Sequence, residues 1–480
     1  MGGALVALSA ANVPAHTPKD NPKCEANPVF IGMNACTCLQ PGTDGVASAA
    51  MKAPPAAPID SSARRRALVP AATLPLAYFA AAHLALAAAL LALVADPHLP
   101  PVFDGSPRLI ALVHLITLGW ITGSILGALY IVGPLALDVP LPATKADVVA
   151  CLSFWAGAFG MAAGFWTNRF HIVGTAALFV LGAIVFVGVR TMRGLSRSRV
   201  PRGVAVHVGL AFANAALAGL AGLLLAQSHL RGGLPWSSPS LAVAHAHLAV
   251  LGWAIMMIFG VAYRLIPMVV PTAMPTGPTL AISAVLLQVG TLGLSGSLAV
   301  GRDVRLWVLI VIAALASFFA QVYCMLRLRR PRAVELPAPD WSTCHTGLAL
   351  LYGIVAAGLA TWLVLGSAPP AVGWGYGAAG LLGFVSQMVV GIQGRLFPLQ
   401  AWFRAMVQNE GEPPARSSHA LVDSRLALTV FLLWLAGLPL LIAGIAGQRA
   451  HLVATGAALL LGGTLANAWH GAIMIARARR

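Results

Sequence analysis

The chain has 480 residues, of which 59% are hydrophobic and only 9% are charged. A soluble domain of this length needs about a quarter of its residues charged, so the composition excludes a soluble globular protein. The formal net charge is +16, but the arginines gather in alternate loops. That pattern orients membrane helices and does not indicate nucleic-acid binding.

The first sixty residues differ from the rest of the chain. Residues 1–60 are rich in Pro, Ala and Gly and contain no apolar run long enough to insert into a membrane. We expect them to form a disordered tail, and we expect residues 61–480 to form one membrane domain.

Twelve apolar stretches follow, each long enough to cross about 30 Å of hydrocarbon at about 1.5 Å per residue. The predicted fold is therefore all-α, a polytopic protein with about 12 transmembrane helices in the lipid bilayer. The expected spans are 67–94, 108–135, 147–167, 171–192, 204–227, 240–269, 278–300, 305–326, 343–366, 373–397, 425–446 and 451–474.

Positive charge marks the loops on one side of the membrane. Arginines precede the first span at 64–66, follow the fourth at 190–202, follow the eighth at 327–332 and end the chain at 477–480. This bias predicts an inner (cytoplasmic) membrane protein with both termini in the cytoplasm. None of the 14 Asp and Glu residues is expected inside the apolar part of a span, although the span 147–167 begins at Asp147. This counts against a proton pump or symporter.

The second and sixth spans share a pattern at identical spacing, which indicates an internal duplication. The second span carries His114, Leu115, Leu118, Gly119, Trp120, Gly127, Tyr130 and Pro134, and the sixth carries His247, Leu248, Leu251, Gly252, Trp253, Gly260, Tyr263 and Pro267.

A third copy lies in the tenth span, where Leu382, Gly383, Phe384, Gly391 and Pro398 fall in register but Ala378 takes the histidine position. The copies are four spans apart, so we predict three pseudo-symmetric four-helix repeats at about 67–192, 204–326 and 343–474.

Each of the two histidines leads an apolar wall, and the glycines lie on the opposite side of the helix, where they favour close helix packing. One imidazole from each of two helices suits the iron of a flat apolar cofactor. We therefore predict a b-type haem held by His114 and His247. The alternative is that each ring bonds a backbone carbonyl or a hydroxyl. His245 lies about 200° around the helix from His247, so it faces a different site, either a second metal centre or a carbonyl or headgroup partner.

The sixth span, from His245-Ala-His247 through Gly260, Tyr263 and Pro267, resembles the His-x-His helix of heme-copper oxidase subunit I, most of all the C-type enzymes. That family also has twelve helices in three groups of four. The resemblance implies a low-spin haem between His114 and His247, a catalytic haem on His245, and a cytochrome or quinol as electron donor. A looser similarity connects the chain to NnrS-type membrane haem proteins.

The sequence departs from the oxidase pattern at the copper site. The His-x-His pair is on the sixth span and not the tenth, and the span 278–300 lacks the histidines that would bind copper. Tyr263 lies roughly 24 Å along the helix from His247, so it does not match the catalytic tyrosine. Copper is therefore not expected.

These observations predict a membrane haemoprotein for electron transfer or small-gas (O2 or NO) chemistry. Whether it is an oxidoreductase resembling a cytochrome oxidase or a nitric oxide reductase stays open. The alternative, favoured by the missing third histidine, is a cofactor-free transporter or scaffold that kept the fold.

Overall fold

The computed structural model describes residues 68–100, 106–231, 238–270, 272–275, 277–329 and 339–479. The predicted tail at 1–60 lies outside these residues. The described part of the chain is helical without strands, and it contains 12 helices long and apolar enough to cross a membrane. The prediction of an all-α chain with about 12 such helices is confirmed.

Nine of these twelve are continuous α-helices, and three are interrupted by a π-helical segment of eight residues. The continuous helices are α2 (Leu74–Ala95), α5 (Lys145–Trp166), α6 (Phe170–Leu195), α7 (Arg202–Arg231), α10 (Thr279–Ala299), α11 (Arg305–Arg327), α12 (Trp341–Leu365), α15 (Ser424–Ala446) and α16 (Ala450–Ala478). The interrupted ones are α3 (Pro107–His114), η1 (Leu115–Thr122) and α4 (Gly123–Ala136); α8 (Ser238–His247), η2 (Leu248–Ile255) and α9 (Met256–Val269); and α13 (Pro370–Ala378), η3 (Ala379–Ser386) and α14 (Gln387–Gln408).

Two helix ends differ clearly from the predicted spans. The first helix begins at Leu74 and not at 67, with Pro75 in its first turn, where a missing N–H is tolerated. The tenth continues past Pro398 to Gln408. Gln400, Ala401 and Ala405 of this extension are buried, and the Gln400 amide donates to the carbonyl of Ala71 at 2.7 Å, so tertiary contacts hold the helix beyond the proline.

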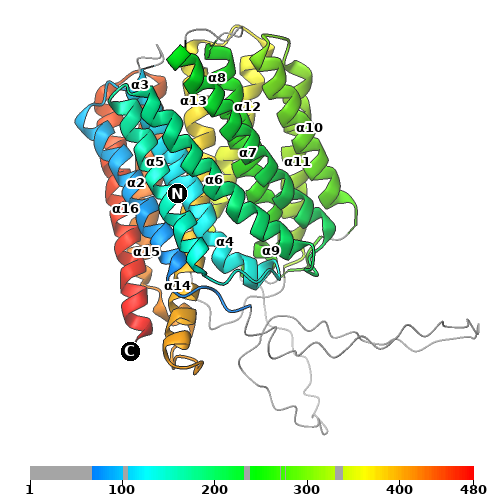
Figure 1. The fold of residues 1–480 in the computed structure, drawn as a ribbon, viewed down its shortest axis with the longest axis vertical. Helices are drawn as coiled ribbons and strands as arrows, with labels where there is room; N and C mark the ends of the chain where they lie inside the picture. The colour runs from blue at the N-terminus through cyan, green and yellow to red at the C-terminus, as the bar shows by residue number, and fades with distance from the viewer. Residues whose placement is uncertain are drawn as a thin grey trace, which may run out of the picture. The chain divides into compact units, whose positions relative to one another are not determined.

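The three interrupted helices run in the same direction through the bundle. Figure 1 shows α3, α8 and α13 at one end and α4, α9 and α14 at the other. Each interrupted helix also packs along the continuous helix that precedes it in its group of four: α2 contacts η1 and α4, α7 contacts η2 and α9, and α12 contacts η3 and α14. His114 and His247, which end α3 and α8, therefore lie toward the same end of the bundle.

The glycine stripe of the interrupted helices is where these packing pairs come closest. A Cβ added to Gly119 would lie 2.4 Å from Cβ of Ala85 in α2, and one added to Gly252 would lie 2.8 Å from Cβ of Asn214 in α7. Gly383 meets α12 in the same way. The prediction that these glycines permit close helix packing is confirmed.

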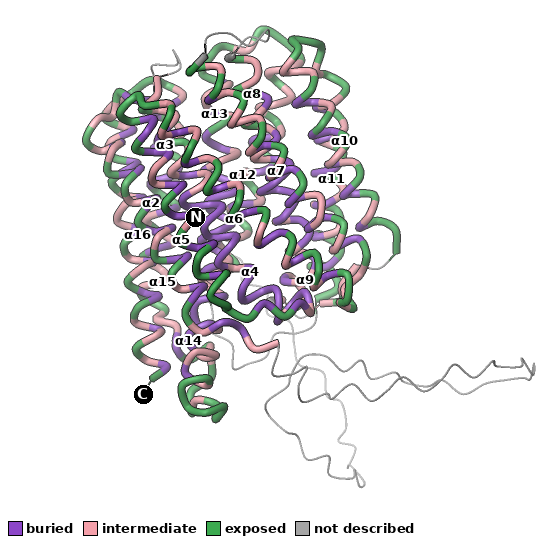
Figure 2. The backbone as a smooth tube through the Cα atoms, viewed as in Figure 1, coloured by how far each residue is buried: buried purple, intermediate pink, exposed green. Residues whose placement is uncertain are grey.

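The outward surface of the bundle is apolar. Leu84, Leu152 and Leu309 are each more than 60% exposed, while the purple, buried residues in Figure 2 follow the inward faces of the helices. Such a surface is unfavourable in water, where contiguous exposed apolar area is normally limited.

Candidate functional site

The three π-helical segments mark corresponding positions. They begin at Leu115, Leu248 and Ala379, directly after His114, His247 and Ala378. Their starts are thus separated by the same intervals as the sequence pattern. π-Helical turns are uncommon and concentrate at functional sites. The backbone irregularity therefore coincides with the position at which the sequence predicts a ligand.

The structure brings His114 next to His245. Their ring centroids are 6.4 Å apart and their planes differ by 18°, so the imidazoles are nearly parallel. Phe165 of α5 packs against His114, with its ring centroid 5.0 Å from that of the imidazole. The site therefore joins α3 and α8.

His247 has a different neighbour, Tyr376 of α13. The Tyr376 hydroxyl donates to Nε2 of His247 at 3.1 Å, and the two rings are nearly parallel with centroids 5.9 Å apart. The ring contacts thus join His114 to His245 and His247 to Tyr376, whereas the prediction paired His114 with His247 as haem ligands. The two contacts follow one rule. His114, His247 and Ala378 are the matched positions of the three interrupted helices, and each histidine contacts the residue two positions before the matched position of the next helix. That residue is His245 for His114 and Tyr376 for His247.

Hydrogen bonds fix which nitrogen of each imidazole is free. Nδ1 of His114 donates to the Ile110 carbonyl at 2.8 Å, and Nδ1 of His245 donates to the Ala218 carbonyl at 2.9 Å. A carbonyl can only accept, so in the neutral ring the proton is on Nδ1 and Nε2 keeps its lone pair. Within the described part of the chain, no hydrogen bond engages Nε2 of either ring. This is the arrangement that metal-bound histidines usually show.

Two further hydrogen bonds hold together the helices that carry this pair. Nε1 of Trp253 in η2 donates to Oγ1 of Thr122 in η1 at 3.0 Å. Near the opposite end, Nε of Arg264 in α9 donates to the Ala136 carbonyl at the end of α4 at 2.8 Å. These two bonds therefore tie the two interrupted helices to each other at two levels. Gly222 of α7 lies directly against His245, because an added Cβ would be 3.2 Å from Cε1 of its ring.

No protein-family model matches the chain, and no curated protein matches it. What the site can bind is therefore inferred from the positions of its own side chains.

The His114–His245 pair could hold a metal-centred cofactor through the two Nε2 atoms. Two imidazoles on one metal place their ring centres about 6 Å apart, given about 2 Å from metal to nitrogen and about 1 Å from nitrogen to ring centre. The observed centroid separation of 6.4 Å is of this size, and the two rings are stacked. Among the described residues no group of three or more His, Cys, Asp or Glu is placed to hold a metal ion.

Each helix that packs along an interrupted helix carries a buried histidine, but not at one repeated position, because Gly260 faces His207 in α7 whereas the matching Gly127 faces Tyr78 in α2. His83 in α2, His207 in α7 and His345 in α12 are all buried, and each lies in the helix that packs along an interrupted helix. Their hydrogen-bond partners include Asn467, Ser283 and Gln387, respectively. The signal was present in the sequence as one histidine in the first span of each group of four.

A buried polar chain connects four helices of the bundle. The Asn467 amide of α16 donates to Nε2 of His83 at 3.1 Å and to Oε1 of Gln393 at 2.8 Å. The Gln393 amide of α14 donates to Oγ of Ser124 in α4 at 3.1 Å. Nδ1 of His83 bonds the Phe79 carbonyl at 2.7 Å, so both nitrogens of this ring have partners and His83 is a core histidine.

The expectation that no carboxylate lies inside a span is wrong for Asp147. It lies in the first turn of α5, fully buried, where it forms an ion pair with Arg190 of α6 and accepts hydrogen bonds from the Tyr130 hydroxyl and the Thr144 backbone N–H, each at 2.8 Å. The carboxylate is tolerated because a cation and several donors surround it. It fastens α4, α5 and α6 together.

One carboxylate between spans is also tightly bound. Asp423, the N-cap of α15, pairs with Arg477 at 2.8 Å, and this hydrogen bond lowers the pKa of the carboxyl below its usual value. Its backbone N–H donates to Nε2 of His470 at 2.9 Å. These contacts attach the start of α15 to α16.

Proposed function

We propose that this chain is an integral membrane protein of three four-helix repeats that binds one b-type haem between His114 and His245. The observation that carries the proposal is the pair itself: two nearly parallel imidazoles with centroids 6.4 Å apart, both with Nδ1 on a carbonyl.

Membrane insertion is supported by the twelve apolar helices and by leucines exposed around the bundle. The arginine-rich loops support an inner-membrane location with cytoplasmic termini. The repeats are supported by the π-helical segments, which recur at the intervals of the sequence pattern.

A ring of three repeats accounts for the observed histidine pairing. In a cyclic arrangement each interface joins two different surfaces, so a residue does not face its own equivalent in the next repeat. His114 would meet His245, and His247 would meet Tyr376. The sequence alone suggested that equivalent histidines face one another, which is a property of twofold interfaces.

The donor set favours electron transfer over gas chemistry. A bound haem would supply one-electron redox chemistry at this site. If His114 and His245 both held the group, a diatomic molecule would have to displace one of these histidines. The Ile110 and Ala218 carbonyls orient the two rings, and Phe165 packs beside His114 on the apolar side. A cytochrome or a quinol is the class of electron donor that fits this role.

The proposal is tested by the reduced-minus-oxidised visible spectrum of the detergent-purified chain, expressed with ample haem supply, together with a measurement of haem per chain. A low-spin b-type spectrum with one haem per chain is expected. Folded protein without haem would overturn the proposal and leave a cofactor-free transporter or scaffold.

A further inference from the structure

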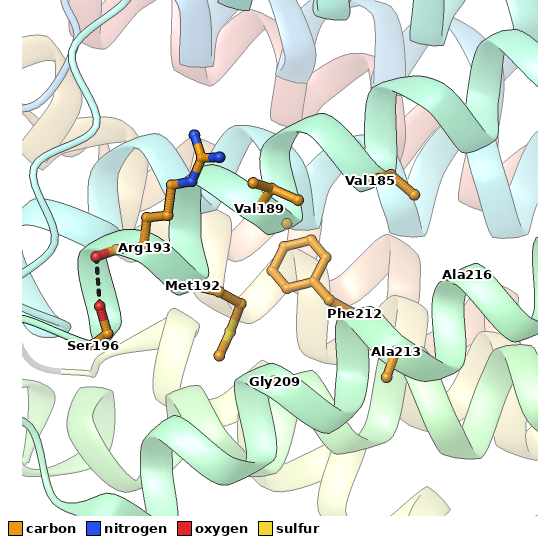
Figure 3. A pocket seen from close by; sticks show the side chains of 10 residues that line it. Val185, Val189, Met192, Arg193, Ser196, Gly209, Phe212, Ala213 and Ala216 are labelled. Atoms are coloured by element: carbon orange, nitrogen blue, oxygen red, sulfur yellow. Dashed lines mark hydrogen bonds between the residues drawn. The ribbon is translucent and has the colours of Figure 1, made fainter.

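A groove of about 500 Å³ lies between α6 and α7 on the outward side of the bundle. Figure 3 shows its wall, in which Val185, Val189 and Met192 of α6 face Phe212 and Ala213 of α7. The three α6 side chains are each more than a third exposed. The lining is therefore apolar and open to the surroundings of the bundle.

Two glycines shape this groove. The Phe212 ring packs on Gly188, because an added Cβ there would lie 2.8 Å from Cδ1 of the ring. On the other helix an added Cβ at Gly209 would lie 3.1 Å from Cε of Met192. The absence of side chains at Gly188 and Gly209 lets the aromatic ring fold inward and leaves room along the helix surfaces.

A positive charge stands at one end of the groove. Arg193 lies in the last turn of α6 and is exposed, and Figure 3 shows its guanidinium above the apolar wall. Within the described residues no carboxylate forms an ion pair with Arg193, in contrast to Arg190, which pairs with Asp147. Ser196 caps this end, with its hydroxyl donating to the Arg193 carbonyl at 2.9 Å.

The length of the groove matches one leaflet of a bilayer. The helical rise from Val185 to Ser196 is about 16 Å at about 1.5 Å per residue, and half of the hydrocarbon core is about 15 Å. A single acyl chain could therefore lie along the groove with its headgroup at the level of Arg193.

We propose that this groove binds one anionic phospholipid, with an acyl chain against Phe212 and Ala213 and the phosphate on Arg193. The apolar wall and the single cation at its end complement the two parts of such a molecule, because a guanidinium binds phosphate through charge-assisted hydrogen bonds. The inference rests on the membrane insertion proposed above and is independent of haem binding.

The test is native mass spectrometry of the full-length chain in detergent, titrated with phosphatidylglycerol or phosphatidylcholine that carry the same acyl chains. Wild type should retain one phosphatidylglycerol about tenfold more tightly than phosphatidylcholine. Arg193→Gln should remove this preference, since one charge-assisted contact corresponds to about a tenfold change in affinity. Ala213→Phe should weaken both lipids by filling the groove.

Two matched variants control for charge and bulk. Arg197 is exposed one turn beyond Arg193 and does not line the groove, and Ala163 is an exposed alanine of α5. Arg197→Gln and Ala163→Phe should bind both lipids as wild type does. Equal retention of the two lipids, or equal weakening by Arg193→Gln and Arg197→Gln, would overturn the proposal. The proposal would also be overturned if the wild-type chain formed a dimer that Ala213→Phe dissociates, because a second copy of the chain would then occupy the groove. A haem-free but lipid-selective chain would contradict only the haem proposal.

Discussion

Replacing Gly119 by alanine should destabilise the bundle through a single added methyl group. Its Cβ would lie 2.4 Å from Cβ of Ala85, whereas apolar carbons pack at about 3.5 to 4.0 Å. Ala85 is fully buried in α2, so one helix must move by about 1 Å or more. Overpacking of this kind costs about 1–3 kcal/mol.

The matched control is Gly174→Ala in α6, where an added Cβ has no atom within 4 Å. Both variants gain about 1 kcal/mol of helix propensity, so the difference in unfolding free energy between them isolates the packing penalty, about 1–3 kcal/mol. The assay is thermal or denaturant unfolding in detergent, followed by circular dichroism. If Gly119→Ala were as stable as Gly174→Ala, the close approach of α2 and η1 would be wrong.

Two further substitutions test polar contacts. Asn467→Leu should destabilise the chain by about 1–3 kcal/mol for each buried acceptor left unpaired. Adding Gln393→Leu should cost less than the sum of the single variants, because they share a hydrogen bond; additive losses in denaturant unfolding would contradict the network. Asp423 has a lowered pKa because Arg477 hydrogen-bonds its carboxylate, so its stabilisation is fully present above its unfolded pKa of about 3.9 and is lost as pH falls through the lower folded value. Asp423→Asn should flatten the dependence of the unfolding midpoint on pH in that acidic range, and an unchanged acid slope would refute the contribution of this pair.

Much of the fold follows from local physical signals in the sequence. The apolar stretches predict twelve helices because each must be long enough to bury itself in hydrocarbon. The glycine stripe that begins at Gly119 predicts close packing because a residue without a Cβ lets a neighbouring helix approach its backbone more closely. Signals that depend on a single helix can therefore be recognised in the sequence alone.

Contacts between distant helices cannot be recognised in this way. The pairing of His114 with His245 depends on which faces meet at an interface, and the π-helical turns of η1 and η2 change the angular spacing on which a 100° periodicity relies. The predicted span 147–167 begins at Asp147, but the ion pair that lets this carboxylate be buried could not be foreseen, because its partner Arg190 is 43 residues away in the sequence. The extension of α14 past Pro398 likewise depends on a contact with Ala71.

The most direct test of the central claim compares the haem content and reduced visible spectra of His114→Ala, His245→Ala and His247→Ala with those of wild type. The proposed site predicts that the first two variants lose the low-spin haem signal and that His247→Ala, whose ring bonds Tyr376, keeps it. Loss of haem in His247→Ala together with an unchanged spectrum in His245→Ala would contradict the proposed pair and place the cofactor between His114 and His247.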